Sequence, residues 1–111
     1  MRLLNARTGS AIASVVELAV TRADRRRGLL GRDALDLSAA LILAPCAAVH
    51  TVFMRFPIDV VFVDRDGCVR TIVRNLQPWR VVASPRAYAA VELAGGVERD
   101  LVPGDRLYLE S

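Results

Sequence analysis

The feature that most constrains the fold is an unbroken apolar run that leads directly into a tight-turn signal. Ile58–Asp64 is rich in β-branched residues and is apolar on both faces of a strand, apart from Asp59. The sequence Asp64-Arg65-Asp66-Gly67 ends this run, and its glycine supplies the positive backbone angle that a hairpin turn needs. Cys68–Leu76 then has the pattern of the return strand. We therefore predict an antiparallel hairpin at the centre of the core.

Short apolar runs bounded by turn signals recur through the rest of the chain. The other predicted strands are Arg2–Asn5, Ala11–Val20, Ala39–Ala44, Val49–Arg55, Val81–Ala83, Ala87–Leu93 and Arg106–Glu110. A short helical turn is expected near residues 97–101. There is no internal repeat or linker, so we predict one domain over residues 1–111. The predicted class is mainly β, a compact β-sandwich or jelly-roll-like barrel of about eight short strands.

One helix is expected in the N-terminal half, over about residues 22–30. Thr21 with Asp24 three residues later fits a capping box, in which the hydroxyl accepts a hydrogen bond from the first turn. Gly31 is placed to end this helix in the left-handed conformation. Gly28 would lie inside the helix, where glycine costs about 1 kcal/mol relative to alanine. This glycine therefore indicates close packing against another part of the chain.

The charge pattern argues against a nucleic-acid partner. All fifteen basic residues are arginines, and the net charge is only +3. The arginines are scattered, and the cluster Arg25–Arg27 has Asp24 and Asp33 close by in the sequence. A nucleic-acid interface needs a concentrated basic face with aromatic residues among the charges. We therefore expect no nucleic-acid partner.

Neither a targeting segment nor a membrane span is expected from the sequence. The first residues contain no sustained apolar stretch before Asn5. The longest weakly polar run, Leu37–Val49, is too short to span a bilayer and is interrupted by Pro45. We expect a cytoplasmic protein, and the sequence leaves its oligomeric state open.

Cys46 and Cys68 are the two cysteines, too few for a disulfide framework. One bridge between them remains possible, although buried free thiols are the preferred interpretation. A metal site would have to combine these thiols with His50 and Asp59, in a spacing that matches no zinc pattern. We therefore predict neither a metal nor a cofactor.

His50 is the only histidine, and it follows Cys46 by four residues. A thiol–imidazole pair can act as a nucleophile, but it also needs an orienting group and an oxyanion site. Neither is recognisable in this sequence, so we predict no catalytic residue. The alternative is a hydrolase-like enzyme that uses Asp59 or His50 as its base.

Two carboxylates, Asp59 and Glu92, stand alone among apolar neighbours, and a buried charge needs a partner. The preferred interpretation pairs Asp59 with an arginine, such as Arg55 or Arg32. Capping of backbone amides at the Phe56-Pro57 bend would serve equally well, and a carboxylate in a ligand pocket is the functional alternative. If Asp59 and Glu92 approach one arginine, they form a buried network that stiffens the fold.

The bend between the two central strands is the candidate ligand site. The predicted ligand-binding residues are Met54, Arg55, Asp59, Arg32 and Trp79. Arg55 and Asp59 would hold polar groups, while Met54, Phe53 and Trp79 would supply apolar contacts. Trp79 either covers the core or is exposed as a binding platform. We therefore predict a non-catalytic module that binds a small ligand or a protein partner in a cleft at Met54–Asp59.

Four short motifs occur in a recognisable order along the chain. They are Arg27–Arg32, Phe53–Asp64, Glu92–Gly95 and Pro103–Asp105. In this order they resemble the bacterial and archaeal family known as domain of unknown function 192, over about residues 16–109. Leu30 stands where the first motif of that family typically has methionine. The resemblance implies a β-sandwich of jelly-roll type with a helix near the N-terminus, and it implies no reaction.

Overall fold

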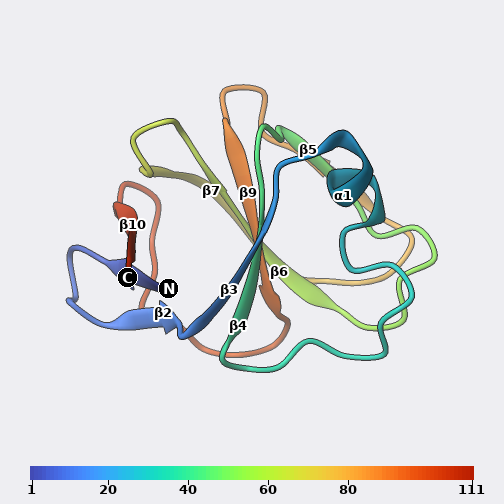
Figure 1. Ribbon diagram of the computed structural model, residues 1–111, viewed down its shortest axis with the longest axis horizontal. Helices are drawn as coiled ribbons and strands as arrows, with labels where there is room; N and C mark the ends of the chain where they lie inside the picture. The colour runs from blue at the N-terminus through green and yellow to red at the C-terminus, as the bar shows by residue number, and fades with distance from the viewer.

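A five-stranded sheet forms the centre of the structure, a computed structural model that describes all residues from 1 to 111. Its strands lie in the order β3-β4-β9-β6-β7. In that order their bounds are Val15–Ala19, Ala39–Leu43, Ala89–Ala94, Ile58–Val63 and Val69–Leu76. Neighbours are antiparallel except β3 and β4, which are parallel. Figure 1 shows these strands fanned about a common centre, as the normal twist of a sheet produces.

Two smaller sheets and one helix complete the fold. The three-stranded sheet has the order β10-β1-β2, with bounds Leu107–Glu110, Arg2–Asn5 and Ala11–Ala13. The two-stranded sheet pairs β5 with β8, which are Ala48–His50 and Val81–Ala83, and the helix α1 is Arg22–Arg27. The three-stranded sheet lies at one end of the molecule, and α1 and β5 lie together at the other (Figure 1).

The register between β6 and β9 decides what each face of the central sheet carries. Both strands are buried along their whole length. Asp59 is paired with Leu93, and Val60 is paired with Glu92. Directly opposed residues of an antiparallel pair share a face, and successive residues alternate between faces. Asp59 therefore lies on one face of the sheet and Glu92 on the other.

Each face has its own hydrophobic core of eleven buried residues. The core on the Asp59 face joins the central sheet to the three-stranded sheet, and it includes Leu3, Val61, Leu93, Leu101 and Leu107. The core on the Glu92 face joins the central sheet to the region of α1 and β5, and it includes Leu29, Leu43, Val49, Met54 and Phe62. The domain is thus layered on both sides of one sheet.

The predicted class is confirmed, because the fold is mainly β with ten strands and one short helix. None of the three sheets closes into a barrel. The central hairpin is present as β6 and β7, with Gly67 at φ 86°. The predicted strand Ala11–Val20 is interrupted at Ser14, whose N–H donates to the carbonyl of Ser38 at 2.9 Å. At this point the chain leaves the three-stranded sheet and enters the central one.

The predicted strand Val49–Arg55 is wrong beyond His50, where β5 ends. The chain turns there, and Phe53 has a positive φ of 65°. The buried Thr51 fixes this turn, because its carbonyl accepts from the N–H groups of Met54 and Trp79, both at 3.0 Å. A turn held by backbone hydrogen bonds to a distant loop leaves little signal in local strand propensity.

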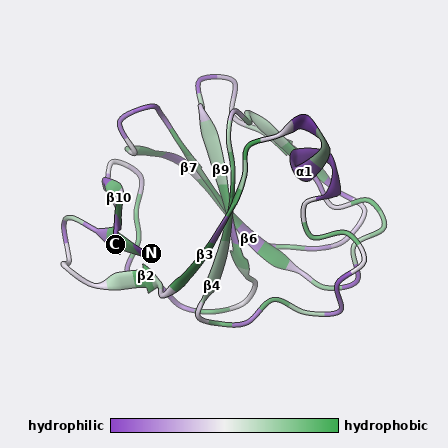
Figure 2. Cartoon of the chain, viewed as in Figure 1, coloured by the Kyte–Doolittle hydropathy of each residue, from purple (hydrophilic) through white to green (hydrophobic).

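Helix α1 begins as predicted, with the Thr21 hydroxyl accepting from the N–H of Asp24 at 3.0 Å. It ends at Arg27, earlier than predicted, because Gly28 leaves the helical conformation at φ 46°. Gly28, and not Gly31, therefore ends the helix. The helix has no buried residue and is strongly hydrophilic (Figure 2). No helix in the chain combines the length and the apolar character that crossing a bilayer requires.

The helical turn predicted near residues 97–101 is wrong, since this segment is irregular. Side chains hold it in place. Arg99 reaches Asp59 and the carbonyl of Ala94, and Arg74 donates to the carbonyl of Leu101 at 2.7 Å. The contacts of Arg99 with Asp59 and of Arg74 with Leu101 join residues far apart in the sequence, so a local pattern does not reveal them.

Candidate functional site

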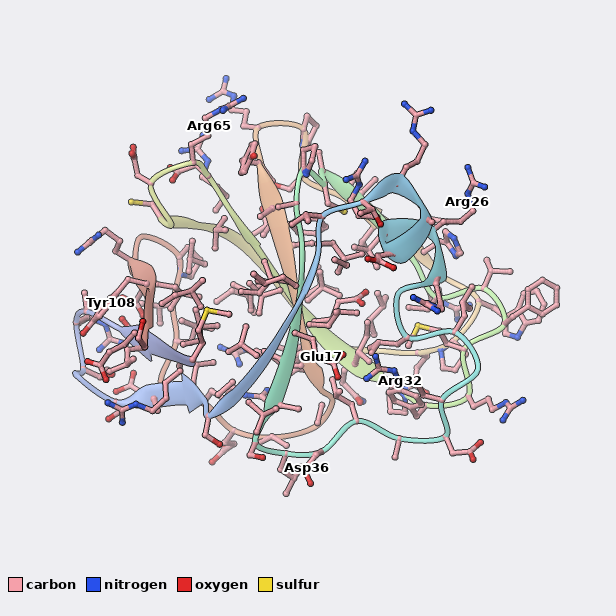
Figure 3. All side chains as sticks on the ribbon, in the orientation of Figure 1. Glu17, Arg26, Arg32, Asp36, Arg65 and Tyr108 are labelled. Atoms are coloured by element: carbon pink, nitrogen blue, oxygen red, sulfur yellow. The ribbon has the colours of Figure 1, made fainter.

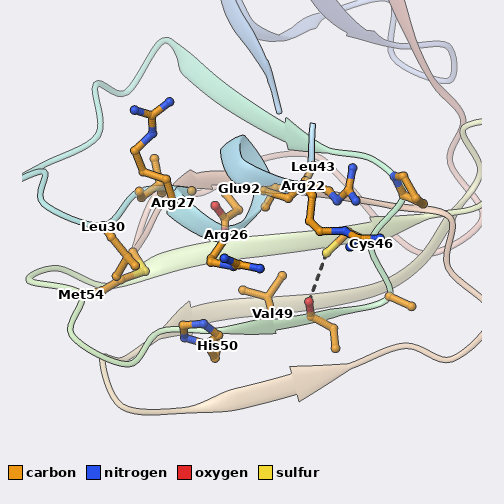
Figure 4. A pocket seen from close by; sticks show the side chains of 16 residues that line it. Arg22, Arg26, Arg27, Leu30, Leu43, Cys46, Val49, His50, Met54 and Glu92 are labelled. Carbon is orange, nitrogen blue, oxygen red and sulfur yellow. Dashed lines mark hydrogen bonds between the residues drawn. The ribbon is translucent and has the colours of Figure 1, made fainter. Parts of the chain in front are cut away.

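A cavity of about 380 Å³ lies between α1 and β5, on the Glu92 face of the central sheet. Sixteen residues line it, half of them hydrophobic. The apolar part of the wall includes Leu29, Leu30, Leu43, Val49 and Met54. Figure 4 shows the opening between the helix and β5, with Met54 at one end and Cys46 at the other. The helix is too short to bury residues of its own, so Leu29, just beyond its end, attaches this layer to the core.

Glu92 is the buried charge of this cavity. Its side chain comes from β9 and the residue is only 3% exposed. Its Oε1 atom is buried and has no hydrogen-bond partner. Burial raises the pKa of Glu92 to about 7, and the positive charge of Arg32 opposes this shift. The carboxyl group therefore changes its charge near neutral pH, inside a cavity that offers it no partner.

Arginines from α1 surround the opening of the cavity. The guanidinium of Arg25 already has partners within the chain, since it donates to the carbonyls of Val20 and Ala44. Arg27 forms an ion pair with Asp24 at 2.9 Å. Arg22 and Arg26 are exposed and make no ion pair with the chain. In the view of Figure 4, Arg26 lies between Glu92 and Val49.

Cys46 and His50 both line the cavity, but they do not form an activated nucleophile. The Cys46 thiol donates to the carbonyl of Ala48 at 3.1 Å. Burial raises the pKa of this thiol, and the charge of Glu92 adds to the rise, although the hydrogen bond to Ala48 lowers it. A thiol with a raised pKa is a poor nucleophile at neutral pH. Cys46 and Cys68 are both free thiols.

Asp59 lies on the opposite face and forms an ion pair there. Its Oδ2 atom accepts from Arg99 at 2.6 Å, and its Oδ1 atom accepts from the N–H of Asn75 at 2.7 Å. Both charged side chains of the pair are almost fully buried. The prediction that Asp59 pairs with an arginine is therefore confirmed, but the partner is Arg99 and not Arg55 or Arg32. Asp59 and Glu92 also share no arginine, because the sheet separates them.

Arg55 and Arg32 bind other carboxylates near the surface. Arg55 forms an exposed ion pair with Asp33 at 2.7 Å. Arg32 forms an ion pair with Glu17 at 2.7 Å, and both residues are labelled in Figure 3. The charge of Arg32 still acts on Glu92, although Arg32 does not line the cavity.

Trp79 does not cover the core, since it is 58% exposed. Its ring packs edge-on against Phe53, which is 72% exposed, with the ring centres 4.8 Å apart. Both residues have positive φ angles, 67° and 65°, which bulky side chains rarely adopt. The buried Thr51 holds their two loops together. This aromatic pair lies outside the α1–β5 cavity.

The comparisons with known proteins give the chain a family. The sequence profile of DUF192, described as an uncharacterized ACR, matches residues 4–109. The chain belongs to the DUF192 family. No curated protein matches it at a significant level.

Two solved structures share the fold of this DUF192 domain. One is a proposed transcription regulator from Sinorhizobium meliloti 1021, with 29% identity and a TM-score of 0.82. The match covers 96% of this chain and 89% of the S. meliloti chain. The other is a protein of unknown function from Novosphingobium aromaticivorans DSM 12444, with 24% identity and a TM-score of 0.81. That match covers 98% of this chain and 84% of its own. At this identity the second match shows the fold alone.

Of the residues predicted to bind a ligand in this DUF192 domain, Met54 lines the α1–β5 cavity. Asp59 instead lines an open, mostly polar depression with Arg74 and Arg99 on the opposite face. Glu92 was recognised as an isolated carboxylate but was not among the predicted ligand-binding residues. Its signal was a single charge in the run Ala89–Ala94, where every residue is buried. No group of three histidine, cysteine or acidic side chains comes close enough to hold a metal ion.

Proposed function

We propose that this domain binds a small ligand in the cavity between α1 and β5. The observation that carries the proposal is the buried, unpaired Oε1 atom of Glu92. An unsatisfied buried polar atom costs about 1–3 kcal/mol, and native structures contain few of them. A ligand that supplies the missing hydrogen bond would recover this cost. The cavity volume of about 380 Å³ is in the range of small-molecule sites.

The proposed site differs in part from the cleft predicted at Met54–Asp59. Met54 contributes to the apolar wall, and Arg32 acts on Glu92 through its charge. Asp59 has its own partner, Arg99, on the other face of the sheet. We therefore propose Glu92 in place of Asp59 as the polar anchor of the ligand.

A thermal-shift screen with a library of small polar and amphiphilic compounds tests the proposal. Compounds that bind in the cavity should raise the melting temperature of the wild-type protein. Ala47→Phe adds a large side chain to the cavity lining and should abolish these shifts. Ala83→Phe is the matched control, because Ala83 is exposed and does not line the cavity. If no compound shifts the wild type, or if both variants respond like it, the proposal is wrong.

A hydrolase-like enzyme is the second candidate function, and the titration of Glu92 favours it. A general base works best when its pKa is near the working pH, and the pKa of Glu92 is raised to about 7. Asp59 is less suited as a base because both of its oxygens accept hydrogen bonds. Hydrolysis of small esters should then follow a pH profile with an inflection near 7 that is lost in Glu92→Gln. A rate unchanged in Glu92→Gln would reject this candidate.

Nucleic-acid binding is the activity that the description of the S. meliloti protein suggests. Six arginines of this chain are instead engaged in ion pairs, namely Arg2, Arg7, Arg27, Arg32, Arg55 and Arg99. Phosphate binding by these six arginines would have to compete with their carboxylate partners. We therefore favour ligand binding, and a salt-dependent affinity for mixed-sequence DNA would argue against this preference.

A further inference from the structure

The lining of the α1–β5 cavity combines a buried carboxyl group, exposed arginines and apolar side chains. Glu92 is buried and has an unpaired carboxyl oxygen. Arg22 and Arg26 are exposed, and neither has an acidic partner in the chain. The apolar part of the lining includes Leu29, Leu43, Val49 and Met54. A ligand that satisfies all three kinds of lining must carry a different polar group for each charged part.

The end group that meets an ionised Glu92 must donate a hydrogen bond. A carboxylate oxygen can only accept, so a hydrocarbon end or a second acid would leave Oε1 unsatisfied. An ammonium or a hydroxyl group supplies the missing donor. Hydrogen bonds in which one partner is charged are stronger than those of a neutral pair. The buried end of the cavity therefore selects a donor.

The end group at the mouth must be an acid. Four arginines of α1 line the cavity, and only Arg27 is neutralised by an ion pair, with Asp24. A purely cationic ligand would be repelled by this charge. A carboxylate or phosphate instead matches the planar donors of Arg22 or Arg26.

We infer that the cavity binds a small organic acid with an aliphatic middle and a hydrogen-bond donor, an ammonium or hydroxyl group, at its far end. The donor contacts Glu92, the aliphatic middle packs on Leu43, Val49 and Met54, and the acid contacts the arginines of α1. This inference rests on the proposed function, since it names the class of ligand for the same cavity.

Four probes built on the same six-carbon chain separate the contributions of the two end groups. ε-Aminocaproate and ε-hydroxycaproate carry both end groups, caproate lacks the donor, and hexylamine lacks the acid. Titration calorimetry at neutral pH should give at least about tenfold tighter binding for one of the first two than for caproate and hexylamine. The preferred member of the first pair distinguishes an amino acid from a hydroxy acid as the natural class. Shorter and longer homologues of each probe cover the possible spacings.

Variants of Glu92 and Arg26 assign the two contacts. Glu92→Gln should remove the preference for ε-aminocaproate over caproate, because the amide carries no charge. Arg26→Gln should reduce the preference for ε-aminocaproate over hexylamine by several-fold. Glu98→Gln and Arg70→Gln are the matched controls, since both residues are exposed and lie outside the cavity. Neither control should change either preference.

The pH dependence of binding to the wild type gives a second readout. An ammonium group is bound more strongly by the ionised form of Glu92, so the affinity for ε-aminocaproate should rise as the pH increases through about 7. A ligand that accepts a hydrogen bond from protonated Glu92 would show the opposite slope. The other charged or titratable groups at the cavity are Arg22, Arg25, Arg26, Arg27, Arg32, Cys46 and His50. The series is repeated in His50→Gln, because His50 also lines the cavity, and the rise in affinity should persist in this variant.

Three results would overturn the inference: caproate or hexylamine binding as tightly as the two-ended probes, a preference for ε-aminocaproate over caproate that survives Glu92→Gln, or no binding by any member of the series. The thermal-shift screen then separates this failure from failure of the proposed function. If compounds of another class are blocked by Ala47→Phe, the cavity remains a binding site and only the ligand class is wrong. If Ala47→Phe blocks nothing, both proposals fail.

Discussion

Asp59 and Glu92 are two carboxylates with nearly the same burial and opposite circumstances. They lie on the neighbouring strands β6 and β9, are 2% and 3% exposed, and point to opposite faces of one sheet. Asp59 has the guanidinium of Arg99 at 2.6 Å and the N–H of Asn75 at 2.7 Å. Glu92 has an oxygen with no partner and a cavity in front of it. Burial alone therefore does not distinguish these two carboxylates, whereas the missing partner of Glu92 does.

The coverings of the two faces explain this difference. On the Asp59 face, the irregular segment after β9 brings Arg99 against Asp59. Burial lowers the pKa of Arg99, and the charge of Asp59 opposes that shift. On the Glu92 face, α1 supplies arginines, but Arg25 and Arg27 are committed elsewhere and Arg32 binds Glu17. The arginines near Glu92 thus provide positive charge without a hydrogen bond.

The largest expected effect is the loss of the Asp59 charge. Asp59→Asn should destabilise the domain by about 3–5 kcal/mol, because it leaves the buried Arg99 without a counter-charge. Urea denaturation followed by circular dichroism measures the change. Asp33→Asn removes an exposed partner of Arg55 and should change stability by no more than about 1 kcal/mol. Equal effects of the two variants would mean that Asp59 is not a structural ion pair.

Glu92→Gln should change the stability of the domain in the opposite direction, by stabilising it. The folded-state pKa of Glu92 is about 7 and its ordinary value is 4.5, so the unfolded chain ionises at lower pH than the folded one. This difference in pKa lowers the free energy of unfolding. The loss of stability is absent below pH 4.5, grows as the pH rises to 7 and is constant above pH 7. Glu92→Gln removes this loss and should stabilise the domain above pH 7 by up to about 3 kcal/mol.

Urea denaturation of the wild type and Glu92→Gln across this pH range measures the difference between them. The two stabilities should converge toward pH 4.5 and diverge toward pH 7. If Glu92→Gln is as destabilising as Asp59→Asn, then Glu92 has a structural partner and the contrast between the two faces is lost.

The smallest expected effect concerns Arg32. Its positive charge lowers the pKa of Glu92, so Arg32→Gln should raise this pKa further. The ion pair of Arg32 with Glu17 is partly exposed, and its loss should cost no more than about 1 kcal/mol. A titration of the Glu92 carboxyl in Arg32→Gln checks the direction. A downward shift would mean that Arg32 does not act on Glu92.

The fold was largely predictable because its strongest signals are local. The run Ile58–Asp64 with its Gly67 turn gave the central hairpin, and Thr21 gave the start of α1. Predictions failed where distant contacts overrule the local pattern. Thr51 binds a loop from another part of the chain and ends β5 early, and Arg99 holds an irregular segment in place of a helical turn.

The candidate site was predictable only in part. Met54 was identified from the apolar bend, and Glu92 was noticed as a lone charge in an apolar strand. The sequence could not tell which of Asp59 and Glu92 lacks a partner. That depends on a register that puts them on opposite faces, and on an arginine that lies forty residues from Asp59 in the sequence.

Titration of Glu92 itself tests most directly whether its buried carboxyl group lacks a partner. Carbon-detected NMR of the labelled side-chain carboxyl, followed across the pH range in the free protein, gives its pKa. We predict a midpoint of about 7, because the carboxyl is buried without a hydrogen-bond partner for Oε1. A midpoint near the ordinary value of 4.5 would mean that Glu92 is solvated or paired, and it would contradict the account.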